Sequence, residues 1–209
     1  MEQVTAAGVY APVVELVAAP FRATRIGRPV LGSSARGGAQ QAAPPWQAVP
    51  VPKLRRITPD DHDDVLALNA ANVVKLAPMD RDRLVALERI ADRFDVIDVD
   101  GEFGGFVVTF APGTSYDSEN YRWFSERHRR FYYLDRIVLE PHHRRQGLAT
   151  FVYDEIEHVA RKYGRLALEV NLVPRNDASL AFHDRRGYAE VGRLGDASHL
   201  VSMREKQLS

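Results

Sequence analysis

Apolar and polar residues follow regular spacings from Lys53 to the end of the chain, and these spacings predict a succession of strands and helices. Short apolar runs bounded by turn residues predict strands, and apolar residues three or four positions apart predict helices. The expected strands are 53–57, 94–99, 106–110, 131–139, 166–172, 188–193 and 200–204. Two helices are expected to begin after the caps Thr58 and Asp80. Two further helices are expected over 147–163 and 176–186.

This order of elements predicts an α/β protein with a mixed sheet and helices on both faces. Asp100 and Gly101 form a turn signal between two strands and predict a hairpin. Residues 111–130 are polar and aromatic without a clear period. We expect them to form a long loop of the functional or mobile kind.

The chain divides near position 52. Residues 1–52 hold seven of the 12 prolines, and each proline fixes φ and removes a backbone donor. We predict a disordered or weakly ordered Ala/Pro/Gly-rich tail and linker there; translation starting further along the chain is the alternative. Residues 53–209 are expected to form one catalytic or binding domain.

Composition narrows the function classes. The net charge is zero, with 28 basic and 28 acidic residues, which argues against nucleic acid as the main partner. The absence of cysteine excludes disulfides, thiolate metal sites and a cysteine nucleophile. The chain shows no bilayer-length apolar run and no basic n-region. We therefore expect a cytoplasmic protein without a membrane partner.

The segment 139–149 carries the clearest chemical signal. A strand ends at Leu139, Pro141 breaks it, and small residues then open a helix behind two arginines. A helix N-terminus presents unpaired N–H groups and partial positive charge, which suit a phosphate. The sequence predicts an anion-binding strand–loop–helix; an ordinary helix start with two solvated arginines is the alternative.

Two motifs resemble the GNAT superfamily of acetyl-CoA-dependent acyltransferases. Arg144-x-x-Gly147-x-Ala149 resembles the family's [Gln/Arg]-x-x-Gly-x-[Gly/Ala] motif, and 176–188 resembles its Asn-x-x-[Ala/Ser]-x-x-[Leu/Phe]-[Tyr/His]-x-x-x-Gly-[Phe/Tyr] segment. The resemblance covers residues 53 to 206. It implies the acyl-CoA N-acyltransferase fold, which is a mixed, mostly antiparallel sheet of six to seven strands, splayed in a V, with helices on both faces.

The resemblance also implies where acetyl-CoA, the expected co-substrate, would bind. Backbone amides of 145–149 would hold the pyrophosphate, and the strand 137–139 would pair with pantetheine and polarise the thioester carbonyl. Asn171 and Asn176 would lie at the gap and bind pantetheine amides, although Asn176 is equally a candidate helix cap. The full set of expected cofactor-binding residues is Ile137, Val138, Leu139, Arg144, Arg145, Gln146, Gly147, Leu148, Ala149, Thr150, Asn171, Asn176, Ser179 and Phe182.

The candidate acid–base residues come from the strand 131–139 and from the second motif. Strand side chains alternate, so we expect Tyr133, Asp135, Ile137 and Leu139 to share one face. Asp135 is the only acid in that strand, and burial would raise its pKa and suit it as a base. The alternative is a structural ion pair, for which the adjacent Arg136 is the poorer partner because neighbouring strand residues face opposite ways.

A proton donor is less clearly marked. His183 stands where many relatives carry a tyrosine that protonates the leaving thiolate, and an imidazole could replace it; a solvated helix histidine is the alternative. Tyr133 and Tyr188 are further candidate acids, or simply core residues. The four aromatic residues expected to contact the acceptor are Tyr116, Tyr121, Trp123 and Phe124.

A metal is not expected. His142 and His143 are adjacent, two neighbouring histidines on a turn rarely point at one ion, and the sequence places no third ligand nearby. The sequence thus favours direct transfer of an acetyl or short acyl group to a primary amine, on a small molecule or a peptide. A catalytically silent acyl-CoA-binding regulatory or sensor domain is the alternative, and a homodimer, common among similar proteins, stays open.

Overall fold

The protein is described here by a computed structural model that covers residues 51–73 and 76–209. Seven strands form one sheet in the order β1-β2-β3-β4-β5-β7-β6. Every neighbouring pair is antiparallel except β4 and β5, which are parallel. The strands are β1 (Pro52–Arg56), β2 (Arg93–Val99), β3 (Glu102–Phe110), β4 (Tyr132–Leu139), β5 (Arg165–Val173), β6 (Ala189–Gly195) and β7 (Leu200–Gln207). The mixed, mostly antiparallel α/β sheet predicted from the sequence is confirmed.

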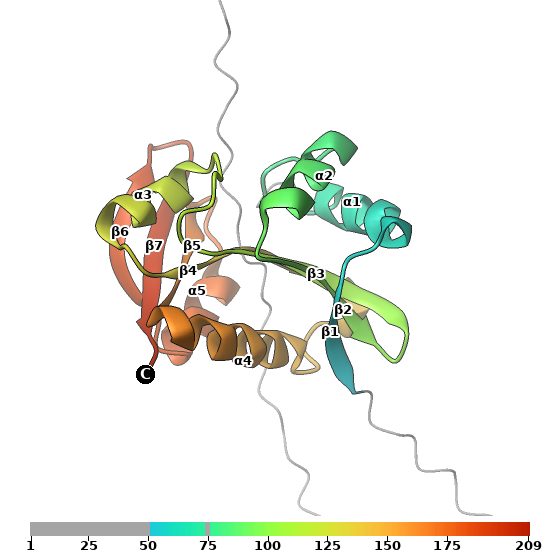
Figure 1. The fold of residues 1–209 in the computed structure, drawn as a ribbon. Helices are drawn as coiled ribbons and strands as arrows, with labels where there is room; N and C mark the ends of the chain where they lie inside the picture. The colour runs from blue at the N-terminus through green and yellow to red at the C-terminus, as the bar shows by residue number, and fades with distance from the viewer. Residues whose placement is uncertain (1–50, 74–75) are drawn as a thin grey trace, which may run out of the picture.

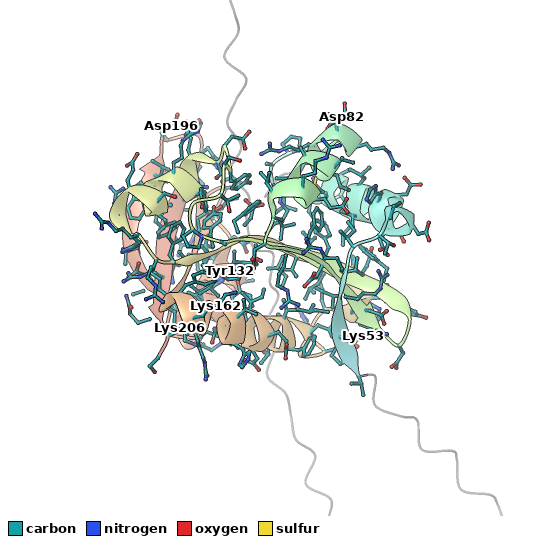
Figure 2. All side chains as sticks on the ribbon, viewed as in Figure 1. Lys53, Asp82, Tyr132, Lys162, Asp196 and Lys206 are labelled. Atoms are coloured by element: carbon teal, nitrogen blue, oxygen red, sulfur yellow. The ribbon has the colours of Figure 1, made fainter. Side chains whose placement is uncertain are left out.

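Helices cover both faces of the sheet (Figure 1). One apolar cluster joins the sheet to α1 (His62–Ala70), α2 (Arg81–Ile90) and α3 (Glu119–Arg127). A second cluster, on the opposite face, joins it to α4 (Leu148–Ala160) and α5 (Asp177–Arg185). Figure 2 shows side chains filling the space on both sides, with Tyr132 near the middle. Among the described residues, no helix has the length and hydropathy needed to cross a bilayer; the tail predicted for 1–52 lies almost wholly outside them.

The loop expected over residues 111–130 is wrong in part, because α3 lies inside it. Ser118 caps this helix by accepting a hydrogen bond from the Tyr121 amide at 3.3 Å. Tyr121 and Phe124, three positions apart, supply its buried stripe. The cap and this spacing were readable signals, but the surrounding charged residues obscured them.

The sheet opens between its two middle strands. β4 and β5 are paired only at Tyr132↔Leu166 and Tyr133↔Ala167. β4 nevertheless continues to Leu139 and stays paired with β3, while β5 continues and stays paired with β7. β4 therefore stays hydrogen-bonded to β3, and β5 stays hydrogen-bonded to β7, while β4 and β5 separate from each other. The V-shaped opening implied by the resemblance is confirmed (Figure 1).

A β-bulge in β4 changes which residues share a face. Val108 of β3 pairs with Arg136 while Thr109 pairs with Leu134, so Asp135 is the extra residue. An inserted residue shifts the two-residue side-chain period. Tyr133 therefore packs in the α1–α2–α3 cluster, whereas Ile137 and Leu139 pack in the α4–α5 cluster. The sequence analysis expected Tyr133, Ile137 and Leu139 to share a face with Asp135. This expectation is wrong for Ile137 and Leu139.

Candidate functional site

The segment between β4 and α4 turns sharply before the helix begins. A short 3-10 helix, η2 (Pro141–His143), follows β4. Arg145 and Gly147 then both adopt left-handed backbone, with φ of 63° and 86°. Gly147 is the N-cap of α4, and its lack of a side chain leaves the first turn without a side-chain cap. The amides at this helix end therefore keep their capacity to bind an anion.

Two side chains of the loop fold back and hold its shape. The Nε of Arg144 donates to the carbonyl of Leu139 at 3.1 Å, and the Nε2 of Gln146 donates to the carbonyl of His142 at 2.7 Å. Arg145 and Thr150 are exposed at the loop and the first turn of α4. The structure thus separates side chains that shape the loop from side chains that are exposed to solvent.

A hollow of about 450 Å³ adjoins this loop on the side of α1. It lies between the end of α1 and the start of η2. Its lining is Ala67, Leu68, Ala71, Asn72, Glu140, Pro141 and Arg144. The loop between β4 and α4 is thus open toward solvent on the side that faces the end of α1.

β5 carries a buried polar side chain beyond the last residue that pairs with β4. Asn171 is fully buried, and neither its Oδ1 nor its Nδ2 has a hydrogen-bond partner among the described residues. Burying an unpaired amide costs about 1–3 kcal/mol. A polar chain lying in the opening between β4 and β5 would satisfy it, so this residue fits an amide-containing ligand.

The second motif forms the start of α5. Asn176 is the N-cap and accepts a hydrogen bond from the Ser179 amide at 3.2 Å, so the capping role open in the sequence is present. Ser179 is buried, and Phe182 packs its ring against Tyr153 with centroids 5.1 Å apart. These residues position α5 against α4 at the end of β5.

His183 is buried, not solvated. Its Nδ1 is 2.7 Å from the carbonyl of Ser179 and its Nε2 is 2.6 Å from the hydroxyl of Tyr153. Burial lowers its pKa to about 3, so the ring is neutral at pH 7. A neutral ring whose Nδ1–H donates to a carbonyl accepts the tyrosine hydroxyl at Nε2. Its one ring proton is held by the carbonyl of Ser179, so burial and the low pKa argue against the expected imidazolium acid.

Asp135 belongs to a closed polar cluster. The Nε of Arg136 donates to its Oδ2 at 2.8 Å, and the hydroxyl of Tyr116 donates to its Oδ1. Arg136 is itself buried and donates to the Oδ1 of Asn69 on α1 at 2.9 Å. The bulge turns Asp135 and Arg136 to the same side, so the sequence-based judgement that Arg136 is the poorer partner is wrong. Both oxygens of this carboxylate are engaged.

A second buried acid was missed in the sequence. Glu169 of β5 is 1% exposed, and its Oε2 accepts a hydrogen bond from the Tyr133 hydroxyl at 2.6 Å. Its Oε1 makes no hydrogen bond of good geometry among the described residues, and the side-chain amide of Asn120 is the group that interacts with this carboxylate besides Tyr133. Burial raises the pKa of Glu169 well above 4.5, and the interactions with the side chains of Tyr133 and Asn120 oppose this rise in part. An acid within the apolar run 166–172 was the available signal.

This acid lies where the sheet opens. Glu169 is two residues past Ala167, and Ala167 belongs to the last pair that joins β4 to β5. Burial, followed by the charge of Glu169, raises the pKa of the Tyr133 phenol well above 10, so the phenol keeps its proton. The pair therefore combines a candidate proton acceptor and a candidate proton donor at the apex of the V.

The aromatic residues expected to contact an acceptor lie mainly in the core. Tyr116, Tyr121 and Phe124 are buried in the α1–α2–α3 cluster, while Trp123 is partly buried and stacks under the guanidinium of Arg127. Tyr188 is also buried, and its hydroxyl donates to Glu157 at 2.9 Å. Core packing is therefore the role that the structure shows for Tyr116, Tyr121 and Phe124, and contact with an acceptor stays a prediction.

Comparison with known proteins identifies the family. The sequence profile of the Acetyltransferase (GNAT) family matches residues 66–188, which is more than half of the chain. The chain therefore belongs to the GNAT acetyltransferase family. A search of curated protein sequences found no match.

Solved structures share the fold at low identity. Ard1 from Thermoplasma volcanium matches with a TM-score of 0.60 and 17% identity, over 76% of this chain and 98% of its own. An N-acetyltransferase from Staphylococcus aureus Mu50 gives 0.57 and 17%, over 76% and 99%. The ribosomal-protein-S18-alanine N-acetyltransferase from Escherichia coli gives 0.54 and 15%, over 76% and 95%. At these identities the similarity shows the fold.

Proposed function

We propose that this protein transfers an acetyl or short acyl group from acetyl-CoA to a primary amine by direct attack. The observation that carries the proposal is the uncapped start of α4 beside the opening between β4 and β5. The helix end suits the two phosphates of CoA. The opening suits an extended chain with amide groups, such as pantetheine, and Asn171 has unpaired groups to offer it.

The proton chemistry is assigned to β5 and β4. A primary amine with a pKa of about 10.4 must lose a proton before or as it attacks. Glu169 accepts this proton at Oε1, since Oε2 is held by Tyr133. The amine nitrogen bonds to the thioester carbon, the tetrahedral intermediate collapses, and the carbon–sulfur bond breaks. The thiolate then takes the proton of Tyr133, which the protonated Glu169 replaces across their 2.6 Å hydrogen bond, or it takes a proton from water.

The backbone of β4 has a separate task. Main-chain amides of 137–139 that face the opening would donate to the thioester oxygen, where negative charge develops. One such donor is worth roughly 3–4 kcal/mol in acyl transfer. The chain contains no cysteine, and we propose no acyl-enzyme intermediate. Acyl label on the protein during turnover would contradict direct attack.

The acceptor class is tested by an amine panel. Acetyl-CoA consumption is measured with polyamines, amino acids, aminoglycosides and peptides with free N-termini, and the product is identified by mass spectrometry. The peptides belong in the panel because one structural relative carries a name for acetylation of a ribosomal-protein alanine. Binding of acetyl-CoA without turnover of any amine would favour the alternative of a silent acyl-CoA sensor.

The position of the diphosphate is tested at Thr150, the exposed third residue of α4. Thr150→Glu places a negative charge that suits the helix end but repels a phosphate. Its neutral match is Thr150→Gln. We expect Thr150→Glu to weaken acetyl-CoA binding about tenfold, as measured by calorimetry, and Thr150→Gln to bind within about twofold of wild type. Equal affinities in the two variants would place the diphosphate elsewhere.

A further inference from the structure

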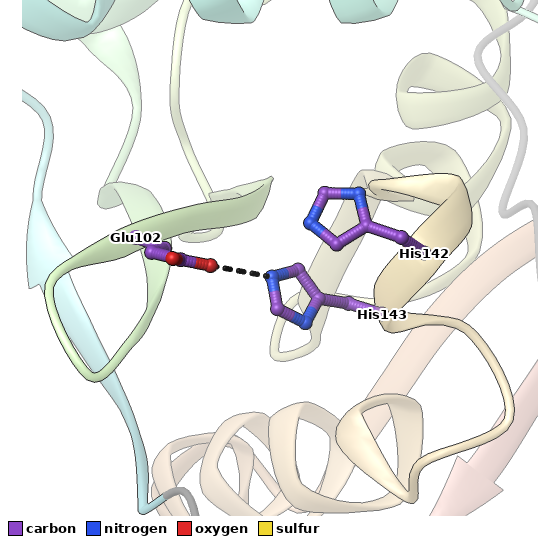
Figure 3. A group of neighbouring side chains, drawn as sticks. All are labelled: Glu102, His142 and His143. Atoms are coloured by element: carbon purple, nitrogen blue, oxygen red, sulfur yellow. Dashed lines mark ion pairs between the residues drawn. The ribbon is translucent and has the colours of Figure 1, made fainter.

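The hairpin between β2 and β3 meets the loop that precedes α4. The amide of Glu140 donates to the carbonyl of Gly104 at 3.0 Å. A side chain at Gly104 would crowd Val99 and approach the ring of His143, so the glycine admits the loop against the hairpin. Glu102, the first residue of β3, thereby comes to face His142 and His143 (Figure 3).

Three potential metal ligands gather at this contact. Ligand atoms of Glu102, His142 and His143 all lie within 4.8 Å of one another. The two imidazole rings lie side by side, with centroids 4.1 Å apart, because the tight turn of η2 keeps adjacent side chains together. The sequence argument against a metal was that adjacent histidines on a turn rarely point at one ion and that no third ligand lies nearby; here the two rings lie together, and the hairpin supplies the third ligand.

His143 needs a partner that the protein does not provide. Its side chain is only 9% exposed, and its Nε2 has no hydrogen-bond partner among the described residues. The nearest carboxylate oxygen, on Glu102, is 3.9 Å away. That is too long for a hydrogen bond. Two zinc–ligand bonds span at most about 4.3 Å, so one ion can bridge this distance.

We propose that Glu102, His142 and His143 bind a divalent transition-metal ion, with Zn²⁺ the best match to two imidazoles and one carboxylate. The side chains of Glu102 and His142 are 75% and 64% exposed, so they can rotate to close the remaining distance. The ion ties the β2–β3 hairpin to η2, four residues before Gly147.

This proposal does not depend on the proposed acyl transfer, and its test uses binding alone. Tag-free full-length protein is treated with a chelator and titrated with Zn²⁺ in competition with a chromophoric indicator. We expect one equivalent to bind. His142→Ala and Glu102→Gln should each weaken binding about tenfold or more, since even an outer-shell partner of a ligand matters by that much. Both side chains are exposed, so both variants should fold.

The matched control is His158→Ala, which removes an exposed histidine on α4 and should bind Zn²⁺ as wild type does. In a second readout, Zn²⁺ should raise the thermal unfolding midpoint of wild type but not of Glu102→Gln. Mg²⁺ should not displace Zn²⁺ from the protein, because imidazole ligands disfavour it. Failure to bind one equivalent, or equal losses from His142→Ala and His158→Ala, would overturn the proposal.

Discussion

Two buried carboxylates lie on the neighbouring strands β4 and β5, and their surroundings differ. Asp135 and Glu169 are each 1% exposed. Asp135 is met by a guanidinium and a phenol, one at each oxygen. Glu169 accepts one well-formed hydrogen bond, from the phenol of Tyr133, and its other oxygen has only a weaker interaction with the amide of Asn120. Burial alone therefore does not distinguish an acid with a structural role from an acid that can take part in proton transfer. The number of carboxylate oxygens left without a well-formed hydrogen bond distinguishes them.

The two acids also differ in their positions in the sheet. Asp135 lies on the bulge, where Arg136 ties β4 to α1 through Asn69. Glu169 lies just past the point at which β4 and β5 separate. A buried charge with complete partners stabilises one arrangement of its strands. A buried acid with a raised pKa at an opening is a candidate for proton transfer.

The largest effect is expected from Glu169→Gln, which keeps the shape and removes the base. We expect kcat/KM to fall by about 10²–10⁴-fold, with acetyl-CoA affinity nearly unchanged and folding stability retained, because a neutral amide is easier to bury. Steady-state kinetics and calorimetry measure these quantities. Glu155→Gln, on the exposed side of α4, is the control. A Glu169→Gln enzyme within about threefold of wild type would remove the distinction between the two acids.

The matching change on β4 should act on stability instead. Asp135→Ala leaves Arg136 buried without its counter-charge, and we expect a loss of about 3–5 kcal/mol in the free energy of unfolding. Urea denaturation measures it. The double variant Asp135→Ala/Arg136→Met should lose less than the two single variants summed, because no charge is then left unpaired. A loss below about 1 kcal/mol in the single variant would show that the pair is dispensable.

His183 extends the comparison to a buried base. Its pKa of about 3 lies below the ordinary 6.5, so the folded state binds its proton less readily than the unfolded state does. The stabilising contribution is complete above pH 6.5 and is lost as the pH falls toward 3, by about 1.4 kcal/mol per pH unit. His183→Phe should therefore flatten the acid limb of a stability–pH curve. An unchanged acid limb, with His158→Gln as the exposed control, would refute this.

The smallest effect is expected where charge is exposed. Arg145 lies at the mouth of α4 with left-handed backbone, which asparagine also tolerates. Arg145→Asn should weaken acetyl-CoA binding about two- to fivefold at low salt, and the difference should shrink as salt screens the charge. Arg161→Asn, at the opposite end of the same helix, is the control. An equal effect of both variants would indicate general rather than local electrostatics.

Sequence alone determined every strand, every α-helix except α3, and the candidate anion-binding segment. Local rules set them: the cap Asp80, which accepts from the Arg83 amide at 2.7 Å as expected, the hairpin turn at Asp100–Gly101, and the helix start at Gly147. Each depends on residues within one turn or one strand. The family motifs are equally local, and the family match spans both of them.

Tertiary structure alone decided which side chains meet. The bulge at Asp135 exists only because β3 pairs with β4 in a shifted register, and it turned Asp135 toward Arg136. Glu169 meets Tyr133 across 36 positions of the chain, and Glu102 meets His143 only after the hairpin has folded against η2. Period and propensity act over a few residues. Register and long-range contact depend on the free energy of the whole sheet, which no short segment encodes.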